Sequence, residues 1–172
     1  MVEDEGLLLE VLNSTPVEQG RSRDLLDGDA GAALSARHGG TGSPAELEHV
    51  REMRRLVQDA VRGAPEAPRS LQRALQGVSL TPAVSEHGID WELSAPGDRL
   101  LAARVALAWA RVADELPGRL RPCANGECHL FLVDHSKPGR AKWCSMATCG
   151  NRMKARAHAA RVTGTAPTPA QR

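Results

Sequence analysis

The chain of 172 residues is poor in aromatic side chains, with three Trp, one Phe and no Tyr. A hydrophobic core must therefore be built mainly from Leu, Val and Ala, and an aromatic platform that stacks single-stranded bases is not expected. The sequence also lacks an apolar run of the roughly 20 residues needed to cross a bilayer. Its first twelve residues are acidic, unlike the basic start of a secretory signal. We expect a cytoplasmic protein that does not enter a membrane.

Motifs of the common enzyme classes are missing as well. The sequence has no phosphate-binding glycine loop, no HExxH motif and no evident pairing of a nucleophile with a base. Hydrophobic residues make up 41% of the chain and charged residues 25%, which is usual for a globular protein. The sequence therefore predicts a globular protein that is not an enzyme.

Charge is distributed unevenly along the chain. Residues 1–118 hold 12 Lys or Arg and 19 Asp or Glu, a balance of −7, whereas residues 119–172 hold 10 and 2, a balance of +8. A basic segment of this kind is typical of proteins that bind a polyanion. The same split would also let the acidic and basic parts attract each other, within one chain or between two. A homodimer is therefore among the partners that the sequence leaves open.

Apolar spacing predicts that residues 1–116 form a mainly helical domain. The strongest helix is expected at residues 43–61, where Ser43 begins a capping box. A second is expected at residues 98–116, with Asp98 as its N-cap. Shorter helices are predicted at residues 7–12, 24–37 and 70–76, and a small hairpin at residues 80–93 with its turn at His87-Gly88.

All four cysteines lie in the basic C-terminal segment. They follow the pattern C-x4-C-x15-C-x4-C, in which two close pairs are separated by a spacer long enough to fold back. A structural zinc ion contributes on the order of 10 kcal/mol to the folding of such small modules. Four thiolates leave no open position for water, so the metal would be structural rather than catalytic. The expected ligands of one Zn²⁺ ion are Cys123, Cys128, Cys144 and Cys149.

Three other interpretations of the cysteines remain open at this point. Two disulfides would need an oxidising compartment, and a thiol redox sensor would have the same spacing. An iron–sulfur cluster also takes four cysteines, although ferredoxin spacings differ from these. His129 and His135 lie between the cysteine pairs and could replace a ligand, but four cysteines already fill the coordination shell.

The residues around the cysteines predict the shape of the module. Residues 130–133 are typical of a short strand, residues 134–139 of a turn, and residues 140–144 would lead back. Residues 145–161 contain many helix formers, so we expect a treble-clef-like zinc finger with a β-hairpin and a helix. Its cations predict a surface for nucleic acid, with DNA as the expected ligand and RNA left open; a solvated basic face without a ligand is the alternative. The residues expected to bind it are Arg140, Lys142, Arg152, Lys154, Arg156 and Arg161.

The sequence around the second cysteine pair also resembles a known family. Residues 144–152 read CSMATCGNR, and together with the CAN sequence at the first pair they resemble the CGNR zinc-finger family over residues 119–161. The resemblance implies that the same four cysteines are the metal ligands. For the motif itself we expect Gly150 to permit a close approach of the backbone to the site, Asn151 to buttress the site and Arg152 to contact phosphate.

Upstream, the sequences LEVLNS at residues 9–14 and DLL at residues 24–26 resemble the ABATE domain that is usually joined to this finger. Proteins of this family are regarded as bacterial stress-induced transcription regulators. The resemblance implies an effector-binding domain at residues 1–116 and a zinc finger at residues 117–161. Residues 162–172 are rich in Pro, Thr and Ala, which predicts a disordered tail. We expect a zinc-dependent, DNA-binding transcription regulator; the alternative is a zinc-stabilised protein-interaction module without direct DNA binding.

Overall fold

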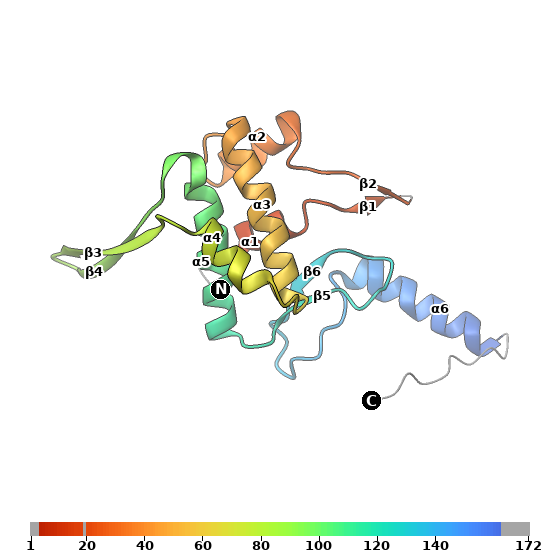
Figure 1. Cartoon of the computed structure of the whole chain (residues 1–172). Coiled ribbons are helices and arrows are strands. Elements are labelled where there is room, and N and C mark those ends of the chain that lie inside the picture. Colours follow the sequence, from red (N-terminus) through yellow and green to blue (C-terminus); the bar gives the residue numbers. More distant parts are fainter. Residues whose placement is uncertain (1–3, 19, 163–172) are drawn as a thin grey trace.

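The computed structural model describes residues 4–18 and 20–162 (Figure 1). These residues form six α-helices and three two-stranded antiparallel sheets, and about 51% of them are helical. No helix in this part of the chain is long and apolar enough to cross a membrane. The predicted tail lies outside it, except for Val162 at the end of the last helix. The helices are α1 (Glu5–Leu12), α2 (Gly28–Arg37), α3 (Pro44–Val61), α4 (Ala67–Ala74), α5 (Leu100–Glu115) and α6 (Asn151–Val162).

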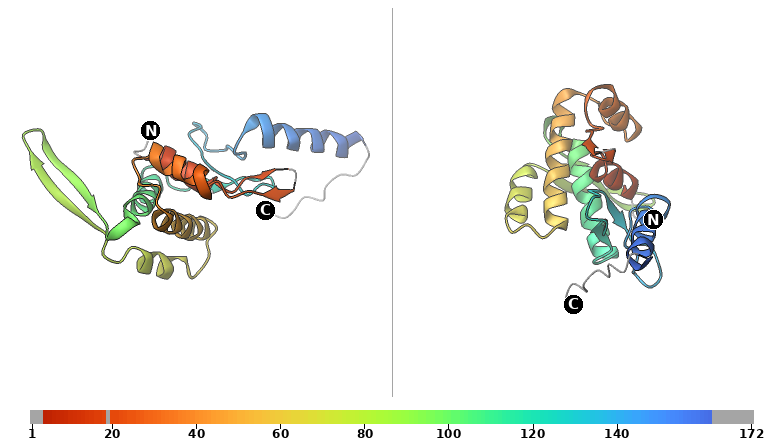
Figure 2. Two further views of the ribbon diagram at one scale, coloured as in Figure 1. Left: turned by 90° about the horizontal axis from the view of Figure 1, so that it is seen from above. Right: turned by 90° about the vertical axis from the view of Figure 1, so that its right-hand side faces the viewer.

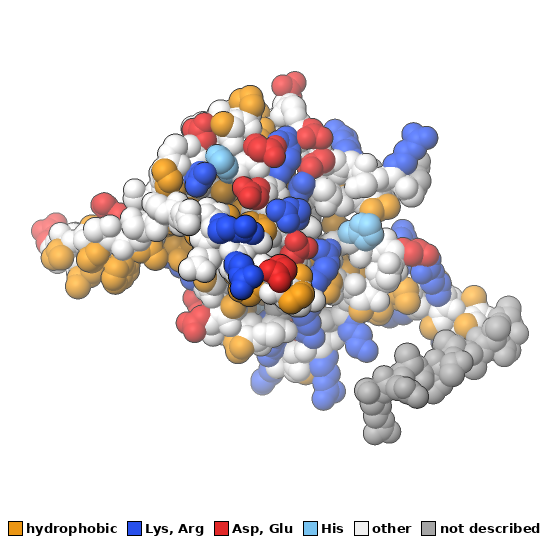
Figure 3. Space-filling model, viewed as in Figure 1, with side chains coloured by type: hydrophobic (Ala, Val, Ile, Leu, Met, Phe, Trp, Pro, Cys, Tyr) orange, Lys and Arg blue, Asp and Glu red, His pale blue; other side chains and the backbone are white. Residues whose placement is uncertain are grey.

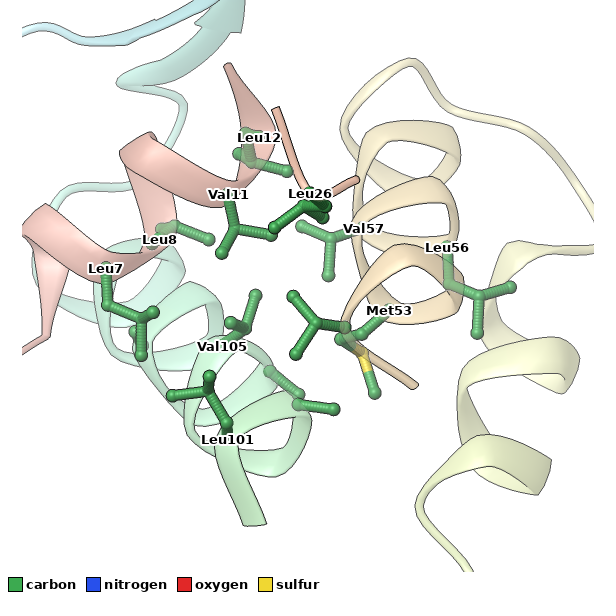
Figure 4. Packing of buried hydrophobic residues seen from close by; sticks show 14 of the residues in the cluster. Leu7, Leu8, Val11, Leu12, Leu26, Met53, Leu56, Val57, Leu101 and Val105 are labelled. Carbon is green, nitrogen blue, oxygen red and sulfur yellow. The ribbon is translucent and has the colours of Figure 1, made fainter. Parts of the chain in front are cut away.

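The core lies among α1, α3 and α5, which pack against one another (Figure 4). It consists of aliphatic side chains, as the scarcity of aromatic residues predicts, and α5 contributes small residues that allow neighbouring helices to approach closely. One side chain of this cluster comes from far along the sequence, because Phe131 is only 1% exposed and packs with the helices. The hydrophobic core therefore extends across the predicted boundary between the helical part and the finger.

Only half of the capping box predicted for α3 is present, because the Glu46 carboxylate bonds to the N–H of Gly42 whereas the N–H of Ser43 donates to Thr41. The Ser43 hydroxyl accepts a hydrogen bond from the Glu46 N–H at 3.1 Å. The Glu46 carboxylate is buried and accepts in turn from the backbone N–H of Gly42 at 2.9 Å, and from the Ser35 hydroxyl. Burial alone would raise the pKa of Glu46, but these hydrogen bonds lower it below its usual value. The side chain at the start of α3 thereby also fixes the loop that follows α2.

The prediction that Asp98 caps the next helix is wrong. The chain makes a 3₁₀ turn, η1 (Gly97–Arg99), and α5 begins only at Leu100. Asp98 lies inside this turn, where its carboxylate accepts a hydrogen bond from the Ser43 hydroxyl at 3.1 Å. Its polar group is therefore used to join the starts of α3 and α5 rather than to satisfy backbone N–H groups.

Two elements project from opposite ends of the molecule (Figure 2). At one end β3 (Ser79–Ser85) and β4 (Gly88–Ser94) form the expected hairpin, whose two-residue turn is Glu86-His87 rather than His87-Gly88. At the other end lies α6, which follows the last cysteine. A shorter pair of strands, β1 (Val17–Glu18) and β2 (Arg21–Ser22), follows α1.

Candidate metal centre and basic helix

The four cysteine sulfurs lie within 4.8 Å of one another, although the two pairs are distant in sequence. Cys144 Sγ lies 3.7 Å from Cys128 Sγ and 3.7 Å from Cys149 Sγ. A tetrahedral zinc ion with Zn–S bonds of about 2.3 Å requires sulfur–sulfur edges of about 3.8 Å. All four cysteines are free thiols. The donor set therefore fits a single tetrahedral zinc ion in both chemistry and spacing.

The first cysteine pair lies in the loop between two short strands. These are β5 (Leu120–Pro122) and β6 (Phe131–Val133), which pair in antiparallel register. The loop is closed by backbone hydrogen bonds of 2.8 Å from Cys123 N–H to Leu130 O and from Cys128 N–H to Asn125 O. Both thiols are thereby directed to the same point by a loop that is anchored in a β-ladder.

The second pair is held by a helical turn. Cys149 lies in one π-helical turn, η2 (Met146–Gly150), which leads into α6. The Ser145 hydroxyl caps this turn by accepting from Thr148 N–H at 3.4 Å. The wide turn places Cys149 in the buried interior beside Cys144, so the metal centre and the start of α6 are one structural unit.

The spacer does not form the hairpin that we expected. The predicted strand is present as β6, but its partner is β5, and residues 140–144 are not in a strand. Backbone groups of the returning segment are used by side chains instead, since Ala141 N–H donates to Asp134 at 2.9 Å and Gly139 O accepts from Arg121 at 3.0 Å. Because these groups are engaged, they are not available for a ladder with β6.

Asp134 organises this segment, a role that sequence analysis missed. Its carboxylate is 1% exposed, lies against Arg121 and accepts hydrogen bonds from the Ser136 hydroxyl and from backbone N–H groups. These hydrogen bonds, the Ser136 hydroxyl foremost, and the charge of Arg121 lower the pKa of Asp134 to about 2 despite its burial. The Asp-x-Ser sequence in a predicted turn is the signal that indicated such a capping carboxylate. Arg119 also lies near Asp134, at 3.8 Å, so both arginines before the first cysteine have structural partners.

Among the described residues, Asn125 is a side-chain amide that contacts a cysteine sulfur. The sequence analysis did not predict it as a site residue. It is fully buried, and its Nδ2 donates to Cys149 Sγ at 3.5 Å, while its Oδ1 accepts from Glu127 N–H at 3.3 Å. The residue thus connects the loop of the first pair to a sulfur of the second. Its position between Cys123 and Cys128 is the sequence feature from which this role could have been predicted.

The thiols have divergent acidities. Burial raises the pKa of Cys144 far above its usual value, and it also raises that of Cys128. Burial acts in the same direction on Cys149, but the hydrogen bond from Asn125 and the neighbouring thiols lower its pKa overall. Four thiolates in such close contact, two of them buried, need a compensating positive charge, which a divalent metal would supply.

The CGNR motif residues are placed as follows. Gly150 is buried, and a Cβ at this position would lie 2.8 Å from Met146 Sδ and 3.2 Å from Trp143 Cδ1. Asn151 is exposed, and its amide donates to Ala147 O at 3.3 Å, one turn earlier. Arg152 is exposed on the first turn of α6. Gly150 therefore leaves room for side chains that cover the site, while Asn151 supports the transition from η2 to α6.

The predicted nucleic-acid contacts are exposed on the surface around this centre. Arg156 is in an ion pair with Glu127, which lies in the loop of the first cysteine pair. No other ion pair of these six residues is found in the described part of the chain. The exposed cations of the return segment and of α6 all lie within the finger: Arg140, Lys142, Arg152, Lys154, Arg156 and Arg161.

The finger is also joined to the helical part by specific contacts. The Asn13 side chain, just after α1, makes two hydrogen bonds to the backbone of Phe131. The Arg62 guanidinium lies 4.7 Å from the centre of the Phe131 ring. His135 Nε2 lies 2.7 Å from the buried Glu5 carboxylate, so this histidine is placed at the junction rather than at the sulfur cluster.

Comparison with known proteins agrees with this geometry. Residues 119–162 match the CGNR zinc finger family, a span that includes all four cysteines and the whole of α6. No curated protein is similar enough to match the chain. The C-terminal segment is therefore a CGNR zinc finger whose four cysteines are close enough to bind a metal ion.

Proposed function

We propose that the chain is a zinc-dependent transcription regulator that binds DNA through α6 and the cations beside the metal centre. The observation that carries this proposal is the placement of α6, a helix with no acidic residue that projects from the molecule directly after the last metal ligand (Figure 1). Zinc, when bound, would hold the loop of the first cysteine pair against η2. Its ligands would thereby fix the direction in which α6 leaves the molecule.

The distribution of cations around α6 supports major-groove binding. At about 100° per residue, Arg152 and Arg156 share one flank, and Lys154 and Arg161 share the roughly opposite flank. A helix in the major groove lies between two sugar–phosphate backbones, so cations on two flanks suit this position better than a single basic stripe. Partly buried Met153 marks the inner side of the helix.

The outer side of α6 carries short side chains. Ala155 lies between the two flanks there, with Ala159 and His158 beside it. Small residues allow the helix axis to approach the base edges, alanine can contact a thymine methyl group, and the imidazole can form a hydrogen bond with a base. This side is therefore the part of α6 that we assign to sequence recognition, whereas the flanks supply affinity.

The helical part is proposed to bind an effector, in line with its resemblance to the ABATE domain. A cavity of about 320 Å³ lies among α3, α4 and α5. Its lining includes the buried apolar residues Met53 and Leu56, the three cations Arg55, Arg73 and Arg99, and one carboxylate, that of Glu52. An apolar lining with an excess of cations suits a small organic anion. The effector would act inside a bacterial cytoplasm, the setting that the sequence predicts.

The proposal can be tested by titrating a fluorescent mixed-sequence duplex with the zinc-loaded full chain at several salt concentrations. We expect the logarithm of the association constant to fall linearly with the logarithm of salt, with a slope of about −0.9 for each phosphate contact. The double variant K154Q/R161Q should reduce this slope by about 2 units. The matched control is R55Q, which removes an exposed cation from α3.

Two results would contradict DNA binding by α6. The first is a zinc-loaded protein that does not bind the duplex even at low salt. The second is binding that R55Q weakens as strongly as the double variant on α6 does. A protein-interaction module without DNA binding predicts the first result, together with nuclease-resistant capture of a protein partner. Parallel titrations with an RNA duplex and a single strand would identify the preferred nucleic acid.

A further inference from the structure

The β3–β4 hairpin is an amphipathic arm whose two faces differ completely in character. Side chains alternate along each strand, so residues paired across the ladder lie on the same face. One face is apolar and consists of three cross-strand pairs, Leu80 with Leu93, Pro82 with Trp91, and Val84 with Ile89. The opposite face is polar and acidic, with Thr81 paired to Glu92 and Ala83 to Asp90.

The apolar face of the arm is largely uncovered. Val84 is 82% exposed, Ile89 63% and Trp91 61%. Figure 3 shows hydrophobic side chains gathered along one edge of the hairpin, away from the body of the molecule. An isolated two-stranded hairpin is at best marginally stable in water, and an apolar patch on a projecting element marks an interaction site. The arm therefore has the composition of a sheet layer whose apolar face is not covered by a second layer within residues 4–18 and 20–162.

The same apolar surface continues into a groove at the base of the arm. The groove has a volume of about 300 Å³ and lies between the hairpin and α5. Leu80 and Leu93 form its wall on the arm, while Ala103, Ala106 and Leu107 form its wall on the helix. Trp109 and Ala110 of α5 also line the groove, so its helix wall combines three alanines with two larger side chains, whereas the arm tip carries the branched side chains of Val84 and Ile89. One chain therefore presents both a projecting apolar tip and an apolar hollow.

We propose that this surface is the dimer interface for a second copy of the chain. The two arms lie antiparallel with their apolar faces in contact, and the two-fold axis passes near Trp91. In this arrangement Val84 and Ile89 at the tip of each arm occupy the groove at the base of the other. The acidic faces, with Asp90 and Glu92, remain in water.

Length and area favour a second copy as the occupant. A strand of seven residues is about 23 Å long, so the tip of an arm laid antiparallel on its partner reaches the partner's base. The four exposed apolar side chains of the arm, Leu80, Val84, Ile89 and Trp91, present on the order of 450 Å² per copy. Together with the groove walls, two copies approach the roughly 1,200 Å² at which stable interfaces begin.

Symmetry is a second reason to expect another copy of the chain as the occupant of this surface. Because tip and groove occur on the same chain, a two-fold pairing covers both tips and both grooves at once, and the assembly closes at two copies. A different protein would have to supply both a hollow for the tip and a knob for the groove. The pairing also leaves both copies of α6 free, since α6 projects from the opposite end of the molecule (Figure 2).

The test is sedimentation equilibrium of the zinc-loaded full chain across the micromolar range. We expect a monomer–dimer equilibrium for the wild type, and at least about a hundredfold larger dissociation constant for V84E, which would bury an unpaired carboxylate in the interface. The matched control is T81K, which places a charge on the polar face of the same strand, opposite Glu92, and should leave the equilibrium nearly unchanged. Circular dichroism and zinc content of V84E must equal those of the wild type, because the side chain at position 84 is exposed in the monomer.

A third substitution separates the groove from the arm. A110W fills the groove from an exposed position of α5 that lines it, and should weaken dimerisation even though the arm is intact. A wild type that remains monomeric throughout would overturn the proposal, as would a dimer that V84E does not weaken. Assemblies larger than a dimer would exclude the two-fold arrangement.

Discussion

Asn13 pairs with the backbone of Phe131 as a neighbouring β-strand would. Its Oδ1 accepts a hydrogen bond from Phe131 N–H at 2.7 Å, and its Nδ2 donates to Phe131 O at 3.2 Å. The Asn13 side chain thus bonds to both the backbone N–H and the backbone C=O of Phe131 in the finger. The ring of Phe131 is buried in the helical core. The helical part and the finger are joined by hydrogen bonds and by apolar packing at the same residue.

We therefore expect N13A to destabilise the whole chain by about 1–3 kcal/mol, because two partly buried backbone groups lose their partners. The measurement is urea unfolding of the zinc-loaded protein, followed both by circular dichroism and by release of zinc. The matched control is N151A, since Asn151 is exposed and bonds only within its own helical segment in the described hydrogen bonds. An equal loss in both variants would show that the Asn13–Phe131 contact has no special role.

Removal of the metal should destabilise more than the finger. Once the thiolates lose their ion, the loop that supports β6 is free to open, and Phe131 belongs to the main core. We expect a chelator to lower the thermal midpoint of the whole chain while the unfolding remains a single transition. An unchanged transition of the helical part, next to a separate loss of α6, would show that the two parts are independent.

Asn125 should control how tightly the metal is held. Its amide donates to the Cys149 sulfur and connects the two cysteine pairs, a type of contact whose loss commonly weakens metal affinity by about 10–100-fold. We expect N125A to lose zinc to a competing chromophoric chelator at correspondingly lower chelator concentrations. Q72A, which removes an exposed amide from α4, serves as the comparison, and its zinc affinity should match that of the wild type. Equal affinities in N125A and the wild type would refute the role of this amide.

The depressed pKa of Asp134 predicts a dependence of stability on acid. A carboxyl group whose pKa falls from 3.8 when unfolded to about 2 in the folded chain stabilises the fold above pH 3.8. That contribution is lost as the pH falls from about 4 to about 2. The wild type should therefore exceed D134N in stability at neutral pH, and the difference between them should shrink across this interval.

The difference between the two proteins is the quantity to measure, because protonation of the cysteine thiolates affects both alike. Urea midpoints at a series of pH values would give it directly. A difference that stays constant from neutral pH down to pH 2 would contradict the assigned ionisation of Asp134. The matched control is D29N, which removes an exposed carboxylate from α2.

Glu127 should restrain DNA binding if α6 is the recognition helix. Its carboxylate pairs with Arg156 and adds negative charge beside the cationic flank of α6. We expect E127Q to bind the duplex several-fold more tightly and to steepen the salt dependence by up to about 1 unit, because Arg156 becomes available for phosphate. E48Q removes an exposed carboxylate from α3 and should leave both quantities unchanged. Weaker binding by E127Q would argue that the ion pair orders the binding surface instead.

Much of the local structure follows from the sequence because it depends on short-range chemistry. The N-cap Ser43, followed by Pro44, specifies where α3 begins, and the hairpin of β3 and β4 was predicted at residues 80–93. The spacing of the cysteines requires that both pairs meet, and the structure brings their sulfurs together. Asp98 shows the limit of such arguments, since a suitable capping residue was bound instead by a side chain from another helix.

The sequence by itself determined the metal ligands and the basic character of the last helix, because residue type and spacing suffice for both. Only the tertiary structure decided which strands pair in the finger and that Asn125 and Asp134 hold its loops, because these depend on partners up to 24 residues away. The hydrogen bond between Phe131 N–H and the Asn13 side chain, which helps to join the finger to the helical core, links residues 118 positions apart in the sequence. Such contacts depend on how surfaces that are distant in the sequence pack together, so the local spacing of residues does not predict them.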